Sequence, residues 1–163
     1  MKCNIDDIFG YLSWNNAPEV QSMGIEMAKK IKFLSVLIMP IEDKSVWENC
    51  AKVLASKSDD ELDRYFIKLF EWIKDMNWPG ADIIYRRLSL VPSQKIMWAY
   101  KYSVSIAEQT HDDIWNLVLS DFYIDNIPVN LFTQLHTASR FQLSGPLSLH
   151  FQYGLEYRRS KNR

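Results

Sequence analysis

Two groups of acidic side chains are the residues best suited to chemistry. The first follows Ser58 at a predicted helix start, and the second, looser group begins at the start of the last predicted helix. Carboxylates in pairs can serve as general acids and bases, and in patches they bind basic groups. Acids at a helix N-terminus also stabilise the helix, by ~0.3–1 kcal/mol each. The first group exceeds what helix capping requires, so we predict partner binding by Asp59, Asp60, Glu61, Asp63, Asp112 and Asp113. Asp121 and Asp125 extend the second group with the same two explanations.

Other reactive side chains lack the spacing that chemistry needs. None of His111, His136 and His150 has a second ligand three or four positions further along the chain, and neither Cys3 nor Cys50 has a CxxC partner. Cys50 falls on the apolar side of a predicted helix, where burial makes a thiol inert. Gly-x-Ser-x-Gly and glycine-rich phosphate loops are missing from the sequence. We therefore expect no metal, no cofactor and no enzymatic activity, with a carboxylate-dependent hydrolase as a remaining alternative.

The spacing of apolar residues predicts a mainly α protein, an antiparallel bundle of about seven amphipathic helices. Ser58 with Glu61 three positions on forms a capping box before one of them. The longest predicted helix is ended by Pro40. The expected helices cover Ile5 to Trp14, Pro18 to Met39, Ser45 to Leu54, Ser58 to Met76, Ala81 to Leu88, Pro92 to Gln109, and a last one capped by Thr110.

The last part of the chain has a different pattern. From Leu147 to Tyr157 apolar and polar residues alternate, and the turn Ser144-Gly145-Pro146 precedes them. A period of two is typical of a strand with one buried face. We predict a helical domain over 1–128 and a C-terminal appendage over 129–163, a β-hairpin packed on the same domain. An isolated hairpin is barely stable, so it must lie against the helices or pair with a partner strand.

The net charge of −1 is divided unevenly along the 163 residues. The appendage has five basic residues, Arg140, Arg158, Arg159, Lys161 and Arg163, against the single acid Glu156. The preceding part therefore keeps 14 of the 19 basic and 19 of the 20 acidic residues, a net charge of −5. An acidic body is a poor surface for phosphates, so we expect no direct nucleic-acid binding. It suits a basic protein partner.

Compartment and membrane association follow from simple features. The N-terminus lacks an apolar signal-type run, and the most apolar stretch, Ile31 to Ile41, is far shorter than the ~20 residues that span a bilayer. Two cysteines without a framework fit a reducing compartment. We expect a cytoplasmic protein that does not associate with membranes. Its oligomeric state is open, since an unpaired C-terminal strand edge could support dimerisation.

Three segments carry a family resemblance. These are Val46-Trp47-Glu48-Asn49-Cys50-Ala51, Asp60-Glu61-Leu62, and Leu69 to Ala81 with its specific core Asp75-Met76-Asn77-Trp78-Pro79-Gly80. They resemble the signature of a small bacterial helical family that looks HEAT-like and has no assigned enzymatic activity. Similar proteins are found among the immunity proteins of polymorphic-toxin and contact-dependent growth inhibition systems. The resemblance covers roughly Ala17 to Asn126, and within it Trp72, Asn77, Trp78 and Pro79 are expected to determine the fold.

The resemblance implies an immunity protein, a cytoplasmic inhibitor that binds and neutralises a cognate bacterial toxin domain. Such toxins are often nucleases with basic clefts, which the acidic surface of the helical body would block. A generic helical-repeat scaffold for another protein is the alternative from the same pattern. The resemblance transfers no catalytic residue, and it does not extend to the appendage.

Overall fold

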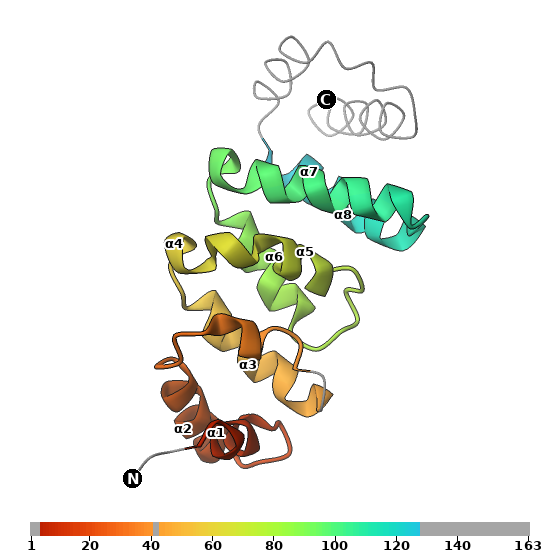
Figure 1. The fold of residues 1–163 in the computed structure, drawn as a ribbon. Helices are drawn as coiled ribbons and strands as arrows, with labels where there is room; N and C mark the ends of the chain where they lie inside the picture. The colour runs from red at the N-terminus through yellow and green to blue at the C-terminus, as the bar shows by residue number, and fades with distance from the viewer. Residues whose placement is uncertain (1–3, 41–42, 128–163) are drawn as a thin grey trace, which may run out of the picture.

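A computed structural model describes residues 4–40 and 43–127, which form an elongated stack of helices (Figure 1). The α-helices are α1 (Ile5–Leu12), α2 (Pro18–Ala28), α3 (Trp47–Ala55), α4 (Asp59–Leu62), α5 (Phe66–Trp72), α6 (Ala81–Ser89), α7 (Ser93–Gln109) and α8 (Asp113–Asn126). Three short 3₁₀ helices join them: η1 (Leu34–Leu37), η2 (Lys44–Val46) and η3 (Asp63–Tyr65). The predicted mainly α bundle is confirmed, whereas the hairpin predicted over 129–163 lies outside the described residues.

The helices are arranged in successive layers along the stack. α1 and α2 pack together at one end, and α3 packs against α2 on one side and α6 on the other (Figure 1). α5 and α6 form the next layer, and α7 and α8 lie over them at the far end. Each inner layer is therefore covered on both sides, while the last described pair is covered by described residues on one side only. In the described part no helix is both long and apolar enough to cross a membrane.

Several predicted helix starts are confirmed. The Glu61 amide donates to Ser58 Oγ at 3.3 Å, and the Ser58 amide donates to Glu61 Oε2 at 3.0 Å, which completes the capping box before α4. Pro18 occupies the first turn of α2, where its missing N–H leaves no bond unmade. α7 begins directly after Pro92. Local capping chemistry thus determines these boundaries.

The predicted helix from Pro18 to Met39 is wrong in its second half. α2 ends at Ala28, and after a turn the chain forms η1 instead. Leu34 and Leu37 are fully buried on η1, three positions apart. A 3₁₀ turn repeats every three residues, so the apolar spacing fits it as well as an α-helix. The last predicted residue, Met39, has a φ of 43°, which continues no right-handed helix.

The two predicted caps Ser45 and Thr110 are also wrong. Asp43 caps η2, which precedes α3, and Asp112 caps α8. Asp43 Oδ1 accepts from the Ser45 amide at 2.8 Å, and Ser45 itself is buried, with its Oγ 2.7 Å from Ser13 Oγ. At the last helix, Asp112 Oδ1 accepts from the Trp115 amide at 3.0 Å. Thr110, expected as that cap, instead ends α7.

The predicted helix from Ser58 to Met76 is divided into α4, η3 and α5, and it ends at Trp72. Its apolar side remains continuous, because Leu62, Phe66 and Leu69 are all fully buried. The division therefore changes the backbone but not the buried surface.

Aromatic side chains join the layers in the core. The Trp47 ring meets Trp72 edge to face, with centroids 5.8 Å apart, and Phe70 meets Phe122 in the same way at 5.2 Å. The second contact joins α5 to α8. Edge-to-face pairs of this kind are worth ~0.5–1.5 kcal/mol beyond their buried area. These rings fix how the layers stack, and so where surface residues of different helices meet.

Candidate functional site

The first predicted acid, Asp59, lies at a junction between layers. Its Oδ1 accepts a hydrogen bond from Arg87 Nη2 at 2.6 Å, and that guanidinium also donates to the Lys57 carbonyl at 2.9 Å. Arg87 comes from α6 and is buried. Removing either partner would leave a charge poorly solvated, so Asp59 has a structural role.

The three acids that follow differ in how far they are engaged. Asp60 forms an exposed ion pair with Lys95 Nζ of α7 at 2.8 Å, and this pair raises the pKa of Lys95. Glu61 completes the capping box, and its bonds to Ser58 lower the pKa of the Glu61 carboxyl. Asp63 is exposed, and its side chain forms no ion pair or hydrogen bond within the described part. Of this predicted group, only Asp63 keeps a carboxylate without a bonded partner there.

The second predicted group lies on the opposite side of the stack, at the turn between α7 and α8 (Figure 1). Asp112 caps α8 and forms an ion pair with Lys74 Nζ at 2.6 Å. The bond from Lys74 is the main cause that lowers the pKa of Asp112. Asp113 is exposed, with no ion pair among the described residues. The structure thus does not bring the six predicted acids together into one surface.

A third acidic surface lies further along α8, and we call Tyr85, Asp121 and Asp125 the acidic edge. Asp121 and Asp125 are four positions apart, so they are neighbours on one side of the helix. Tyr85 Oη donates to Asp125 Oδ2 at 3.3 Å. Partial burial and then the Asp125 carboxylate raise the pKa of Asp121. Neither carboxylate forms an ion pair with a described residue, so the edge has uncompensated negative charge.

The acidic edge was only partly evident from the sequence. Asp121 and Asp125 belonged to the looser acidic group, but they were not among the predicted contact residues. A usable signal was present, since no Lys or Arg occurs between Lys101 and the end of α8. Tyr85 could not be found in this way, because it reaches Asp125 from α6 across 40 positions of sequence.

The signature segment after α5 stabilises the fold, as expected. Trp72 Nε1 donates to the Pro79 carbonyl at 3.1 Å, which closes the loop on itself. Asp75 Oδ1 accepts from both the backbone and the side-chain amide of Asn77. Gly80 precedes α6 with a φ of 79°. These contacts explain the segment structurally without assigning it a ligand.

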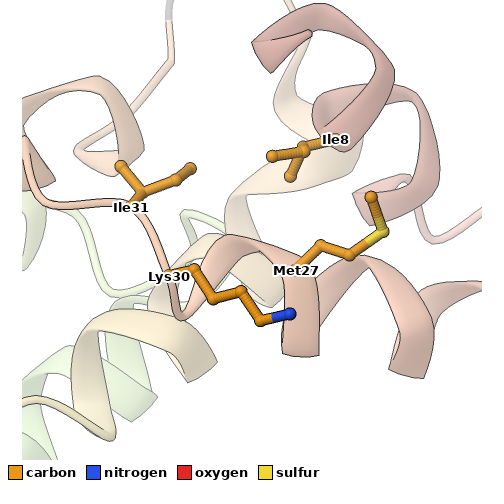
Figure 2. Close-up of a pocket in the computed structure, with 4 residues that line it drawn as sticks. All are labelled: Ile8, Met27, Lys30 and Ile31. Carbon is orange, nitrogen blue, oxygen red and sulfur yellow. The ribbon is translucent and has the colours of Figure 1, made fainter. Parts of the chain in front are cut away.

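One hollow lies at the N-terminal end of the stack, between α1 and the end of α2. Figure 2 shows Ile8, Met27, Ile31 and the Lys30 side chain around it, and its volume is about 260 Å³. None of the predicted acids lines this hollow, so it provides no paired-carboxylate site. Within the described residues, no three His, Cys, Asp or Glu side chains gather to hold a metal. Burial raises the pKa of the Cys50 thiol to about 12, as an inert core cysteine requires.

The protein is thus a layered stack of helices, and its acidic side chains lie on the surface at helix ends and along α8. The chain belongs to the family described as a domain of unknown function (DUF5071), which matches residues 42–140, more than half of its length. No curated protein and no solved structure matches the chain.

Proposed function

We propose that the protein is an immunity protein, which binds a cognate bacterial toxin domain in the cytoplasm and blocks it through an acidic surface. The proposed toxin is a nuclease with a basic cleft. The proposal begins from the resemblance of the segment around Asp75–Gly80 to immunity proteins, and it assigns the contact to the acidic edge.

The acidic edge is the observation that carries this proposal. Asp121 and Asp125 repel one another on adjacent turns, and like charges at this spacing destabilise a helix. The pKa of Asp121 is raised first by partial burial and then by this repulsion. A lysine or arginine from a partner would relieve it, whereas Asp59, Asp60, Glu61 and Asp112 already have such partners within the chain. The edge also adjoins the exposed apolar residues Ile114 and Leu117 of α8, and an interface combines both kinds of contact.

The test is to co-express the chain with the product of the gene immediately upstream and to measure complex formation by surface plasmon resonance at several salt concentrations. For the variant Asp121→Asn with Asp125→Asn, we expect the association rate to fall roughly threefold to tenfold, because electrostatic steering depends on these charges. Raising the salt concentration should slow the wild type more than the variant, because screening acts on the charges that the variant lacks.

A matched control makes the same change of charge at the other end of the stack. Glu19→Gln with Glu26→Gln also removes two negative charges, both from exposed positions on α2. This control should associate nearly as fast as the wild type. If both double variants slow association equally, the acidic edge is not the contact surface. If the purified chain and the upstream product form no complex, the immunity function itself is overturned.

A further inference from the structure

The first layer of the stack has an apolar surface around the hollow between α1 and the end of α2. Among the described elements, α3 packs on α2 and η2 on α1, both on the side of the layer that faces the rest of the stack (Figure 1). Three apolar residues line the hollow, and three exposed ones lie close to them. We call these six residues the N-terminal face: Ile5, Ile8, Met23, Met27, Ile31 and Phe33. An exposed group of large apolar side chains is typical of an interaction surface.

Helix geometry extends this surface along both helices. Ile5 lies three positions before Ile8 on α1, and Met23 lies four positions before Met27 on α2. Residues at these spacings are neighbours on one side of a helix. Ile8 and Met27 line the hollow (Figure 2), whereas Ile5 is 37% exposed and Met23 47% exposed. The apolar surface is therefore larger than the hollow alone, and its methionine side chains can adapt to a partner.

Phe33 is an exposed aromatic ring beside a hollow of suitable size. Its side chain is 77% exposed, although large aromatic side chains are usually buried or in contact with a partner. Phe33 follows Ile31 by two residues, so their Cα atoms lie within about 7.6 Å of each other. An apolar cavity of ~150 Å³ accepts a benzene ring, and the hollow has about 260 Å³. The N-terminal face thus combines a protruding ring with a hollow that is large enough to receive one.

The charges at this end favour contact between two copies of the chain. Residues 4–40 contain three basic and four acidic residues, a net of −1, whereas residues 43–127 contain ten and fourteen, a net of −4. Two acidic molecules repel one another least where their surfaces are nearly neutral. Lys30 borders the hollow and has no ion pair within the described part, although its neighbour Lys29 is paired with Glu26. Charges of both signs at one end allow two copies to place lysines toward acids.

We infer that two copies of the chain associate through their N-terminal faces about a two-fold axis, with Phe33 of each copy in the hollow of the other. A two-fold contact uses the same surface on both molecules, so that surface must contain both complementary parts, as the N-terminal face does. The ammonium group of Lys30 then lies near an aromatic ring, which is a favourable contact. For the same reason a second copy is favoured over an unrelated partner. The acidic edge, at the other end of the stack, stays accessible, so the inference does not depend on the proposed toxin.

Sedimentation velocity of the full chain from about 1 to 200 µM tests the inference. We expect a dimer with a dissociation constant of roughly 1–100 µM, because an interface of this size is small. Phe33→Ser and Met23→Ser should each raise the dissociation constant about tenfold or more, since a few large residues carry most of the energy of an interface. Both side chains are well exposed in a single copy, so we expect both variants to fold, which circular dichroism checks.

The matched control is Leu90→Ser, at the turn between α6 and α7. Leu90 is 77% exposed, as Phe33 is, and its loss should leave the dissociation constant unchanged. A wild type that stays monomeric over the whole range would overturn the inference. Dimerisation that Phe33→Ser and Met23→Ser leave intact, or that Leu90→Ser weakens equally, would also overturn it, because another surface would then form the contact. Species larger than a dimer would exclude the two-fold arrangement, which closes at two copies.

Discussion

At the scale of single residues, Ser103 is the exception in an otherwise well-paired interior. Its Oγ is the side-chain polar atom that is buried without a hydrogen-bond partner among the described residues. An unpaired buried hydroxyl costs ~1–3 kcal/mol, part of which packing recovers. Its neighbours Ala99 and Ala107 on the same side of α7 are small and buried, so a methyl group fits there.

We expect Ser103→Ala to leave the free energy of unfolding unchanged or to raise it by up to about 1 kcal/mol. Urea denaturation followed by circular dichroism measures this change. Ser120→Ala is the matched control, since Ser120 Oγ donates to the Asn116 carbonyl at 2.8 Å and loses a real bond. A greater loss of stability in Ser103→Ala than in Ser120→Ala would indicate that Ser103 has a polar partner.

The sequence shows which residues are acidic, but it predicts their bonding partners only when these are close along the chain. The capping role of Glu61 was predictable, because its partner Ser58 is three positions away. The Asp59–Arg87 pair spans 28 positions and exists only because the fold brings the start of α4 to Arg87 of α6. Charge type and local spacing contain no information about such packing. Sequence alone therefore could not show which of these acids form ion pairs within the chain.

At the scale of elements, Gly80 controls the entry into α6. Its φ of 79° is strained for any residue with a side chain. A Cβ at this position would come within 2.6 Å of the Ala51 Cβ on α3. The glycine therefore permits both the turn and the close approach of α6 to α3.

We expect Gly80→Ala to destabilise the protein by about 2–5 kcal/mol, through backbone strain and forced separation of the helices. Thermal and urea denaturation would measure the loss. Gly10→Ala is the control, because Gly10 lies in α1 and a Cβ there meets nothing within 4 Å. That variant should gain about 0.5–1 kcal/mol from helix propensity. A mild effect of Gly80→Ala, comparable to Gly10→Ala, would show that α6 can move away from α3 at little cost.

Element boundaries were predictable where side chains cap the backbone and not where packing decides. The start of α4 follows from its capping box, which is a local signal. The end of α2 at Ala28 had no such signal, since the apolar spacing continues through Leu34 and Leu37. Both residues reach the core from a 3₁₀ turn, which the sequence alone does not distinguish from a longer helix.

At the scale of the whole molecule, acids make opposing contributions to stability. Bonds from Ser45 lower the pKa of Asp43, and bonds from Ser58 lower that of Glu61. The pKa of Asp112 is lowered chiefly by the bond from Lys74. A carboxyl with a lowered pKa in the folded state stabilises above its unfolded value, about 3.9 for Asp and about 4.3 for Glu, and this contribution is lost as pH falls. Asp121 has a raised pKa, so its ionised form destabilises the fold at neutral pH and protonation removes that penalty.

Asp112, the N-cap of α8, and Asp121, within the helix, should therefore change the pH dependence of stability in opposite directions. Asp112→Asn removes a group that loses stabilisation in acid, so it should lower stability at pH ~7 and make the decline toward pH ~3.5 shallower than in the wild type. Asp121→Asn removes a group that recovers stability in acid, so it should raise stability at neutral pH and make the decline steeper. Urea denaturation across this range measures both slopes. If the free energy of unfolding of the two variants instead falls with pH at the same slope, Asp112 and Asp121 interact with solvent rather than with Lys74 and Asp125. Opposite changes would show that the carboxylate at the start of α8 stabilises the fold when it is ionised, whereas the one within α8 destabilises it.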